Sequence, residues 1–379
     1  MSVSAERVEF HPSAGPSLGV EVELGLVDRT TLELVPASAD VLEAVRPPGE
    51  PEHARAKNEF YASSLEIITG ICGTVAEARA DLLATIAEVD AELRPRNLAM
   101  QPGGDHPTAR WQNLTVSAKP RYQEFAEWIQ WPARRSMCHG IHYHVGVRSG
   151  DAAVAIANAV ATSIPTLLAP SASSPFWSGQ DTGMASSRTK VFEGMPTADL
   201  PAELPDFTAF QELMIAMQRA GAIRSVRELW WDVRPHPGFG TVELRICDAM
   251  GTLDEILALA ALAQCLVADL NDRFDAGESL PRLPRWALKE NKWRAARWGM
   301  EADVIGTDGG TLPVREALAR EVTRLGPVAG ALGCAAELAS VLEVAGDPGY
   351  VRQRRIAHET GDLDAVTRDL VQRWPHGDR

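Results

Sequence analysis

The stretch Leu18-Gly-Val-Glu-Val-Glu-Leu-Gly25 alternates apolar and acidic residues, and it decides how the rest of the chain can fold. In an extended strand successive side chains point to opposite faces, so Glu21 and Glu23 share one face. The opposite face carries the aliphatic residues Val20, Val22 and Leu24. The stretch therefore predicts a strand with an apolar face for the core and two carboxylates roughly 6–7 Å apart on the other face. The simplest alternative is an antiparallel strand whose polar face meets water.

Two later strands repeat this arrangement with complementary chemistry. In Gly140-Ile-His-Tyr-His-Val145, His142 and His144 share a face, as expected of a pair of metal ligands or of a pair of hydrogen-bonding histidines at a sheet edge. In Thr241-Val-Glu-Leu-Arg-Ile246, Glu243 and Arg245 share a face, with Val242, Leu244 and Ile246 behind them. A Glu-x-Arg pair taken alone is usually a solvated ion pair.

Taken together, the three strands favour a functional site. If they lie in one sheet, its polar face gathers three carboxylates, two imidazoles and one guanidinium. Such crowding of carboxylates raises their pKa values unless a cation lies among them. Oxygen-rich ligation with imidazole suits Mg²⁺ or Mn²⁺ better than Zn²⁺, and two such ions typically lie about 3.5–4 Å apart when they clamp a reacting phosphate. Arg245 would face that phosphate.

Two further acids, Glu59 and Glu66, are candidate ligands of the same site. Their separation of seven is odd, so one unbroken strand cannot place both on one face. A turn or bulge near residues 62–64 is needed to bring both to the metals. Glu66 is the stronger candidate because it is a lone acid among Leu65, Ile67 and Ile68 and is costly to bury without a partner.

Composition narrows the class of protein. The chain has 379 residues and a formal net charge of −14, from 37 basic and 51 acidic residues, which argues against a nucleic-acid partner. The five cysteines form no CxxC motif, as expected of a reducing compartment. Residues 1–10 are polar, with no apolar signal-peptide core, and the apolar run 256–268 is too short to span a membrane. We expect a cytoplasmic protein without a membrane partner, and a homo-oligomer is compatible with the sequence.

Hydrophobic spacing predicts helices and strands in mixed order. Helices are expected at 36–45, at 75–93 after a cap at Thr74, at 119–133, at 152–168, at 210–220 and at 253–270. Strands are expected at 60–69, 140–147, 230–233 and 241–247, with turns at 99–107 and 235–238. Residues 171–209 show no period and predict a functional loop. A soft boundary near 280 separates a catalytic body, 1–280, from a helical region, 281–379, that packs on it.

Six segments together resemble the ATP-dependent carboxylate–amine ligases related to glutamate–cysteine ligase, particularly the type 2 bacterial branch. In order they are Leu18-Gly-Val-Glu-Val-Glu-Leu, Ser64-Leu-Glu-Ile-Ile-Thr-Gly, Gly140-Ile-His-Tyr-His-Val-Gly, Ser171-Ala-Ser-Ser-Pro-Phe-Trp, Leu229-Trp-Trp-Asp-Val-Arg-Pro and Gly240-Thr-Val-Glu-Leu-Arg-Ile-Cys-Asp. Their order and spacing match from about residue 17 to about residue 370, so the resemblance covers nearly the whole chain.

The resemblance implies an α+β fold like that of glutamine synthetase, with a curved, mainly antiparallel sheet forming an open funnel and helices behind it. It also implies that ATP phosphorylates an amino-acid carboxylate, usually that of glutamate, and that an amine such as that of cysteine attacks the acyl phosphate. Two or more Mg²⁺ or Mn²⁺ ions are implied. One ion would be held by Glu21, Glu59 and Glu66, and the other by Glu23, His142 and Glu243.

The resemblance also implies roles for basic residues. Arg245 would stabilise the transferring phosphoryl group, and Arg188 in the serine-rich stretch would help to hold nucleotide or substrate. Relatives carry asparagine or histidine at the position of His144, so the resemblance alone does not make it a ligand. Independently of the resemblance, Arg234 could pair with a substrate carboxylate beside Trp230 and Trp231, for which a place in the core is the alternative.

Two other functions compete with a ligase. A metal-dependent amide hydrolase could use the same histidines and acids to activate water, and it would turn over amides without nucleotide. A non-catalytic binding protein could share the fold, but a site without activity has no reason to keep three carboxylates together. The identity of the carboxylate and the amine cannot be read from the sequence.

Overall fold

The opening stretch forms a central strand of one sheet in the computed structural model, which describes residues 8–377. Residues 1–7, most of the polar N-terminal stretch considered above, lie outside the described part. The main sheet consists of β1 (Leu18–Asp28), β2 (Ala56–Asn58), β3 (Ser64–Ile68), β4 (Leu98–Gln101), β5 (Gly140–Gly146), β8 (Val233–His236) and β9 (Thr241–Asp248). The strand order is β2-β3-β1-β5-β9-β8, with β4 paired to β1, and every pairing is antiparallel. The expected α+β class with an open, mainly antiparallel sheet is confirmed.

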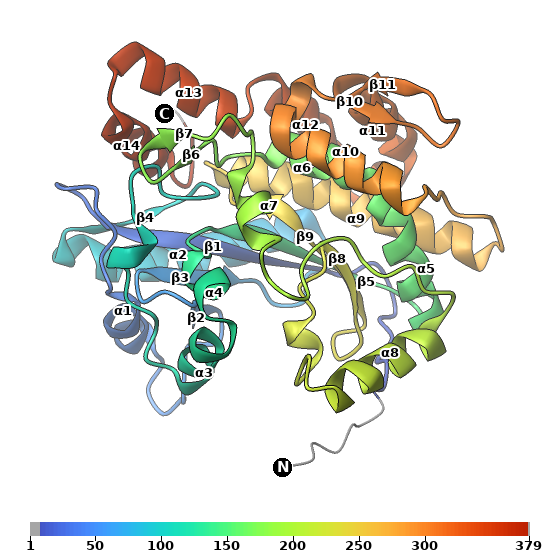
Figure 1. Ribbon diagram of the computed structural model, residues 1–379, viewed down its shortest axis with the longest axis horizontal. Coiled ribbons are helices and arrows are strands. Elements are labelled where there is room, and N and C mark those ends of the chain that lie inside the picture. The colour runs from blue at the N-terminus through green and yellow to red at the C-terminus, as the bar shows by residue number, and fades with distance from the viewer. Residues whose placement is uncertain (1–7, 378–379) are drawn as a thin grey trace.

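Fourteen α-helices accompany this sheet in the described part of the chain. They are α1 (Ser38–Val45), α2 (Val75–Leu93), α3 (Pro120–Ile129), α4 (Trp131–Arg135), α5 (Gly150–Val160), α6 (Ile164–Ser171), α7 (Ser187–Phe192), α8 (Phe207–Arg219), α9 (Leu253–Asp275), α10 (Arg285–Trp298), α11 (Val314–Leu332), α12 (Ala335–Gly346), α13 (Gly349–Thr360) and α14 (Leu363–Arg373). Contacts with the strands come chiefly from α2, α5, α6 and α9. Figure 1 shows α9 running alongside the sheet, and the Tyr143 hydroxyl on β5 donates to the carbonyl of Ile256 in α9 at 2.9 Å.

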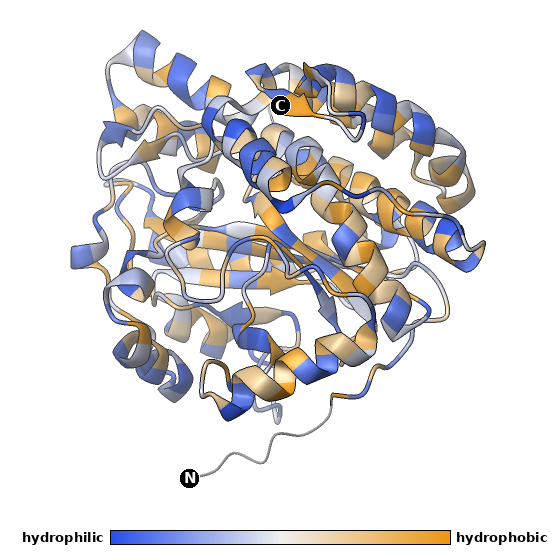
Figure 2. Ribbon diagram, turned by 45° about the vertical axis from the view of Figure 1, so that its right-hand side comes forward, coloured by the Kyte–Doolittle hydropathy of each residue, from blue (hydrophilic) through white to orange (hydrophobic). Residues whose placement is uncertain are grey.

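The apolar residues of the opening stretch lie where their spacing predicts. Val20, Val22 and Leu24 are at most 1% exposed and belong to the main core. Isoleucine and leucine side chains from β3 and β5 join them there. In Figure 2 the strands and the helices against them are largely hydrophobic, whereas the outer helices alternate in colour. Burial of this face therefore turns the acidic face of β1 toward the opposite side of the sheet.

The region after residue 280 is helical and continues the same core. Helices α11 and α12 pack against α9, and the core runs without interruption from Leu18 to Ala345. In Figure 1 these orange and red helices lie together on one side of the molecule. Two short strands, β10 (Asp303–Ile305) and β11 (Thr311–Pro313), form a hairpin between α10 and α11.

One segment in the described part of the chain is long and apolar enough to cross a membrane. It is Gly150–Ser171, which comprises α5 and α6, and 78% of its most apolar window is buried inside the fold. Its side chains pack against α9 and the strands β8 and β9. That burial is typical of a core helix.

Several sequence expectations were wrong in detail. Pro235 and His236, expected in a turn, belong to β8, where proline is tolerated because β8 is an edge strand. Residues 99–101, expected at the start of a turn, belong to β4, whose four residues are all buried and so show no alternation. The loop 171–209 contains α7 and the small hairpin of β6 (Phe176–Trp177) and β7 (Gln180–Asp181).

Candidate active site

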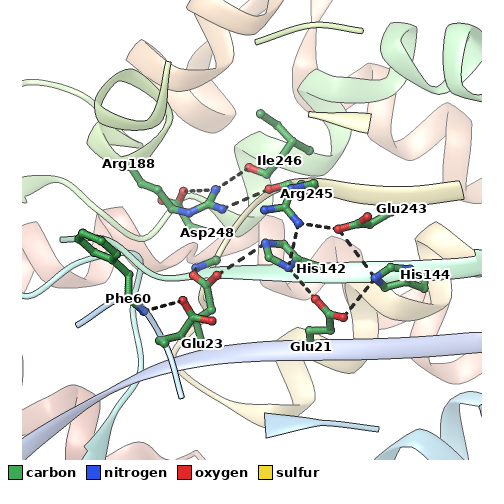
Figure 3. A network of polar contacts seen from close by, with 12 residues as sticks. Glu21, Glu23, Phe60, His142, His144, Arg188, Glu243, Arg245, Ile246 and Asp248 are labelled. Atoms are coloured by element: carbon green, nitrogen blue, oxygen red, sulfur yellow. Dashed lines mark hydrogen bonds and ion pairs between the residues drawn. The ribbon is translucent and has the colours of Figure 1, made fainter. Parts of the chain in front are cut away.

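A row of ionisable side chains crosses the polar face of four neighbouring strands. The strand register places Glu23 opposite Glu66 and Glu21 opposite His142. It also places Glu243 between His144 on one side and Arg234 on the other. Figure 3 shows the side chains of Glu21, Glu23, His142, His144, Glu243 and Arg245 pointing toward one another. The structure therefore brings together segments more than 200 residues apart in the sequence.

His142 lies at the centre of this row. Its Nδ1 is 2.9 Å from Oε2 of Glu21, and its Nε2 is 3.8 Å from Oε1 of Glu23. The other oxygen of Glu21 is 3.3 Å from Nε2 of His144. Glu23 in turn accepts a hydrogen bond from the backbone N–H of Gly140 at 2.5 Å. The imidazole of His142 thus lies between the acids, with Glu21 near its Nδ1 and Glu23 near its Nε2.

Two groups of three residues could each hold a metal ion. Ligand atoms lie within 4.8 Å of one another in the set Glu21, His142 and Glu243, and in the set Glu23, Glu66 and His142. This division exchanges Glu21 and Glu23 relative to the one that the resemblance implies. The strand register is the reason, because it sets Glu21 directly beside His142 and Glu23 directly beside Glu66. His142 is common to both groups.

Arg245 reaches the row from a bulge in β9. Ile141 pairs with Cys247 and Tyr143 pairs with Leu244, so Arg245 and Ile246 together lie opposite His142. A bulge of this kind re-aims a side chain. Val242, Leu244 and Ile246 all belong to the main core, as expected, and the bulge adds Cys247 to the buried side opposite Ile141. Nη1 of Arg245 donates to Oε1 of Glu243 at 2.5 Å and lies 3.4 Å from Nδ1 of His142.

Arg234 holds Glu243 from the edge strand. Its Nε donates to Oε2 of Glu243 at 2.6 Å and its Nη2 to Oε1 at 3.2 Å. Its Nη1 donates to the carbonyls of Val226 and Leu229, both at 2.7 Å. Arg234 and Glu243 are 4% and 1% exposed. In this structure Arg234 positions a candidate ligand, and it makes no contact with open space where a substrate carboxylate could bind. Trp231 is buried beside Phe210, and Trp230 packs on Phe125.

The electrostatics of the row divide its acids into two kinds. Burial acts to raise the pKa of Glu243 and that of Glu21, but arginines around Glu243 and histidines around Glu21 outweigh it, so both pKa values lie well below the ordinary range. Burial raises the pKa of Glu66 well above its ordinary value, and the neighbouring carboxylates raise it further. Burial and the charge of Glu23 raise the pKa of Glu59 to about 8. The acids near β3 thus lack compensating positive charge.

The histidines differ in the same way. Burial and the adjacent Arg245 lower the pKa of His142, which keeps the imidazole neutral. Burial acts to lower the pKa of His144 as well, but the charges of Glu243 and Glu21 outweigh burial, so the pKa of His144 is raised. Nδ1 of His144 is 3.1 Å from the hydroxyl of Thr241. Only a neutral imidazole can bind a metal, so His142 has the properties of a ligand in its present surroundings, whereas the two carboxylates beside His144 favour its protonated form.

Glu59 lies at the edge of the site. It follows β2, and a turn at residues 61–64 separates it from β3, as the odd spacing predicted. Its carboxylate accepts a hydrogen bond from its neighbour Phe60 at 3.1 Å and lines one small cavity with Glu23. Glu59 belongs to neither of the two ligand groups.

Arg188 lies behind the row rather than in it. Its guanidinium donates to the carbonyls of Arg245 and Ile246 at 3.2 and 3.3 Å, and it lies 3.8 Å from Asp248. It fits there because Gly140 has no side chain: a Cβ would meet Nη2 of Arg188 at 2.1 Å. Arg188 therefore holds the backbone of the β9 bulge, although it also lines a small cavity with Arg245.

Sequence reasoning assigned no role to Asp248 and Lys292. Asp248, which ends β9, accepts from the backbone of Ser173 and from the hydroxyls of Ser174 and Ser186 at 2.7–2.9 Å, and so ties the serine-rich loop to the sheet. A lone acid directly after an apolar strand was the available signal. Lys292 is 1% exposed on α10, and its helical spacing from the buried Ala295 and Ala296 marks that face as internal.

The comparisons with known proteins agree with one family. The model of glutamate–cysteine ligase family 2 matches residues 17–369. A Frankia alni protein named "Putative glutamate--cysteine ligase 2-1" is 46% identical over 375 residues, covering 98% of each chain. A Thermobifida fusca protein named "Putative glutamate--cysteine ligase 2" is 41% identical over 373 residues, covering 98% of this chain and 94% of the relative.

Solved structures share the fold at low sequence identity. A glutamate–cysteine ligase from Francisella tularensis in complex with AMP superposes with a TM-score of 0.65 at 12% identity, covering 96% of this chain and 89% of that one. A bifunctional glutathione synthetase from Pasteurella multocida gives 0.66 at 15% identity, covering 95% of this chain and 51% of that one. The match over nearly the whole length and the close relatives lead to one conclusion: the chain belongs to glutamate–cysteine ligase family 2, a family of ATP-dependent ligases that form an amide bond.

Proposed function

We propose that this enzyme activates the carboxylate of an amino acid, glutamate, as an acyl phosphate and couples it to an amine, cysteine or another, with release of ADP and phosphate. The observation that carries the proposal is the row of acids around His142, backed by Arg245. The names of the relatives support the choice of glutamate and cysteine as first substrates to test. Phosphoryl transfer needs positioning and positive charge more than a covalent nucleophile, and this face supplies both.

The residues present fit divalent cations. Both candidate groups combine two carboxylates with one imidazole, a donor set that suits Mg²⁺ or Mn²⁺. Burial, and after it the neighbouring carboxylates, raise the pKa values of Glu59 and Glu66, as expected of crowded acids without a cation. We assign one ion to Glu21, His142 and Glu243, and a second to Glu23 and Glu66, because a neutral imidazole has only one nitrogen free to bind a metal. Glu59 and His144 would support these groups from the rim. Bound there, the ions would neutralise the phosphate oxygens of ATP.

Arg245 has the position required of a residue that binds the transferring phosphoryl group. Its guanidinium is held beside Glu243 and His142, at the junction of both ligand groups and one small cavity. A planar guanidinium binds pairs of phosphate oxygens. Glu243 orients Arg245 and is oriented in turn by Arg234, so the three residues form a preorganised unit across β8 and β9. Arg188 keeps the backbone of that unit in place.

ATP, an amino acid and an amine are the partners that this proposal requires. All five cysteines are free, and the ATP that the reaction consumes is a cytoplasmic metabolite, so we place the enzyme in the cytoplasm.

A substrate screen tests the proposal. Purified enzyme with Mg²⁺ and ATP is incubated with pairs of amino acids and amines, ADP release is measured, and coupled products are identified by mass spectrometry. We expect ADP release that depends on both substrates and on Mg²⁺, and a product one water lighter than their sum. Glu23→Gln should abolish it. Product formation without ATP would identify a hydrolase acting in reverse and contradict the proposal.

A further inference from the structure

Lys292 is buried at the centre of a cluster of three acids. It lies on α10, in the helical region after residue 280, and is 1% exposed. Its Nζ is 2.6 Å from Asp232, 2.9 Å from Glu193 and 3.1 Å from Asp199. An ammonium group has three N–H donors, so each carboxylate can accept one. Burying such a cation is costly unless every donor is matched.

The three acids belong to the wall of the cavity beside Arg245. Glu193 follows α7, Asp199 lies in the loop after it, and Asp232 immediately precedes β8. All three line the small cavity that Arg188 and Arg245 also line. The cluster therefore connects α10, which carries Lys292, with the cavity beside Arg245.

Asp199 needs external support. Its φ is 106°, a backbone conformation that residues other than glycine rarely adopt. The side chain of Asp199 forms an ion pair with Lys292, and the carbonyl of Asp199 accepts the N–H of Asp232 at 3.0 Å. Lys289 also reaches Asp199, at 3.4 Å, but that lysine is 64% exposed and contributes little.

A continuous chain of hydrogen bonds leads from Lys292 to Arg245. Lys292 holds the side chain of Asp232, and the carbonyl of Asp232 accepts the backbone N–H of Arg245 at 2.8 Å. That N–H belongs to the β9 bulge, where the regular pairing with β5 is interrupted. The bulge directs the guanidinium of Arg245 onto Glu243 and His142.

We propose that Lys292 is a positioning residue for the ligation reaction: from the C-terminal helical region it fixes Asp232 and thereby keeps the β9 bulge in the geometry that aims Arg245 at the site. This role rests on the proposed function of Arg245. If Lys292 has this role, the helical region after residue 280 contributes to catalysis, which its sequence pattern does not predict.

The test is a double-mutant cycle between Lys292 and Arg245, with Lys292→Met and Arg245→Lys made singly and together. Alone, Lys292→Met should lower kcat by about tenfold or more while KM for ATP changes less than about twofold, because Lys292 touches neither ligand group. In the Arg245→Lys background the same change should cost less than about threefold. The matched control is Lys289→Met, which removes the exposed neighbour and should leave kcat and KM unchanged.

A purely structural role predicts a different pattern. An equal loss of kcat in both backgrounds, or an unchanged kcat in a folded Lys292→Met protein, would overturn the proposal. If Lys292→Met does not fold, Lys292→Met/Asp232→Asn replaces it in the cycle, because the second change removes one of the carboxylates left without a cation. The same coupling to Arg245 is expected of that variant.

A crystal structure of the Lys292 variant separates this proposal from the proposed function. We expect the contact between Arg245 Nη1 and Glu243 Oε1, 2.5 Å here, to be lost, with the Glu21–His142 contact retained. An unmoved Arg245 would overturn the role of Lys292 whatever the substrates are. Absence of ADP release by the wild-type enzyme with every substrate pair would instead count against the proposed function and leave this structural result to decide the role of Lys292.

Discussion

At the scale of single residues, the site depends on how each charge is compensated. Arg234 and Arg245 satisfy Glu243, and two histidines satisfy Glu21, whereas burial and other carboxylates outweigh the arginines near Glu59 and Glu66. Positive charge is therefore concentrated on the β8–β9 side of the row, and the β3 side is left acidic. An incoming cation is expected to stabilise the β3 side most.

Replacement of Arg245 by alanine should lower kcat by roughly 1,000-fold, because the guanidinium stabilises charge that develops during phosphoryl transfer. Steady-state ADP release gives the measurement, and Arg245→Lys should recover only part of the rate because an ammonium cannot bind oxygens in pairs. Arg219→Ala, on the exposed end of α8, is the control and should have no effect. A rate in Arg245→Ala within threefold of wild type would contradict the assigned role.

The metal-free enzyme should lose stability as the pH rises from about 5 to about 8. The pKa of Glu59 is raised from its ordinary value to about 8 in the folded chain, so between these values the folded state binds more protons than the unfolded state. Stability is therefore greatest below the ordinary pKa and declines through pH 8. Thermal unfolding in EDTA measures this slope.

Added Mg²⁺ should raise the Tm more at pH 9 than at pH 6, since the ion replaces protons on Glu59 and Glu66. Glu59→Gln should flatten the pH dependence measured in EDTA. A Tm that rises with pH in the absence of divalent ions would show that these carboxyl groups are not buried together.

At the scale of elements, the β9 bulge and its contact with α7 shape the site. Gly140 on β5 leaves the space in which Arg188 reaches the bulge carbonyls, and an added Cβ would meet that guanidinium at 2.1 Å. Gly140→Ala should therefore destabilise the fold by about 1–3 kcal/mol and lower kcat, as overpacking displaces Arg188. Urea unfolding and ADP release measure the two effects.

Gly238→Ala is the matched control for this substitution. It lies in the turn between β8 and β9, and the nearest atom to an added Cβ, on His236, is 3.9 Å away, an ordinary contact distance. It should leave both stability and kcat nearly unchanged. Equal effects from the two alanines would show that the space above Gly140 has no special role.

Alternation in the sequence predicted which residues of β1, β5 and β9 face the site because one face of each strand is apolar. It could not reveal the bulge at Arg245 and Ile246, since the apolar Ile246 fits a regular strand equally well. It also placed Pro235 in a turn, because the edge position that tolerates proline is a property of the whole sheet. The pairing of Glu21 with His142 and of Glu23 with Glu66 follows from strand register, which no single strand encodes.

At the scale of the whole molecule, the region after residue 280 shares its core with the sheet domain. Helices α11 and α12 cover α9, and Lys292 on α10 joins the acids around the cavity. The boundary near residue 280 therefore stays a prediction, and we expect the regions on its two sides to fold as one unit. The sequence could not indicate Lys292, because its three partners come from segments about 60–100 residues away.

Calorimetry should show one cooperative unfolding transition for the full chain, because removal of α11 and α12 would expose the apolar surface of α9. A fragment ending at residue 280 should be insoluble or lack cooperative unfolding. Two resolved transitions, one of them retained by the fragment, would show that the two regions fold independently.

The acids around His142 are expected to hold divalent cations in two groups. Equilibrium Mn²⁺ titration followed by electron paramagnetic resonance, with a non-hydrolysable ATP analogue present, tests this expectation most directly. We expect two tightly bound ions per wild-type chain, one fewer in Glu66→Gln, one fewer in Glu21→Gln, and one fewer in His142→Ala. Full Mn²⁺ occupancy in the double variant Glu21→Gln/Glu66→Gln would contradict this expectation.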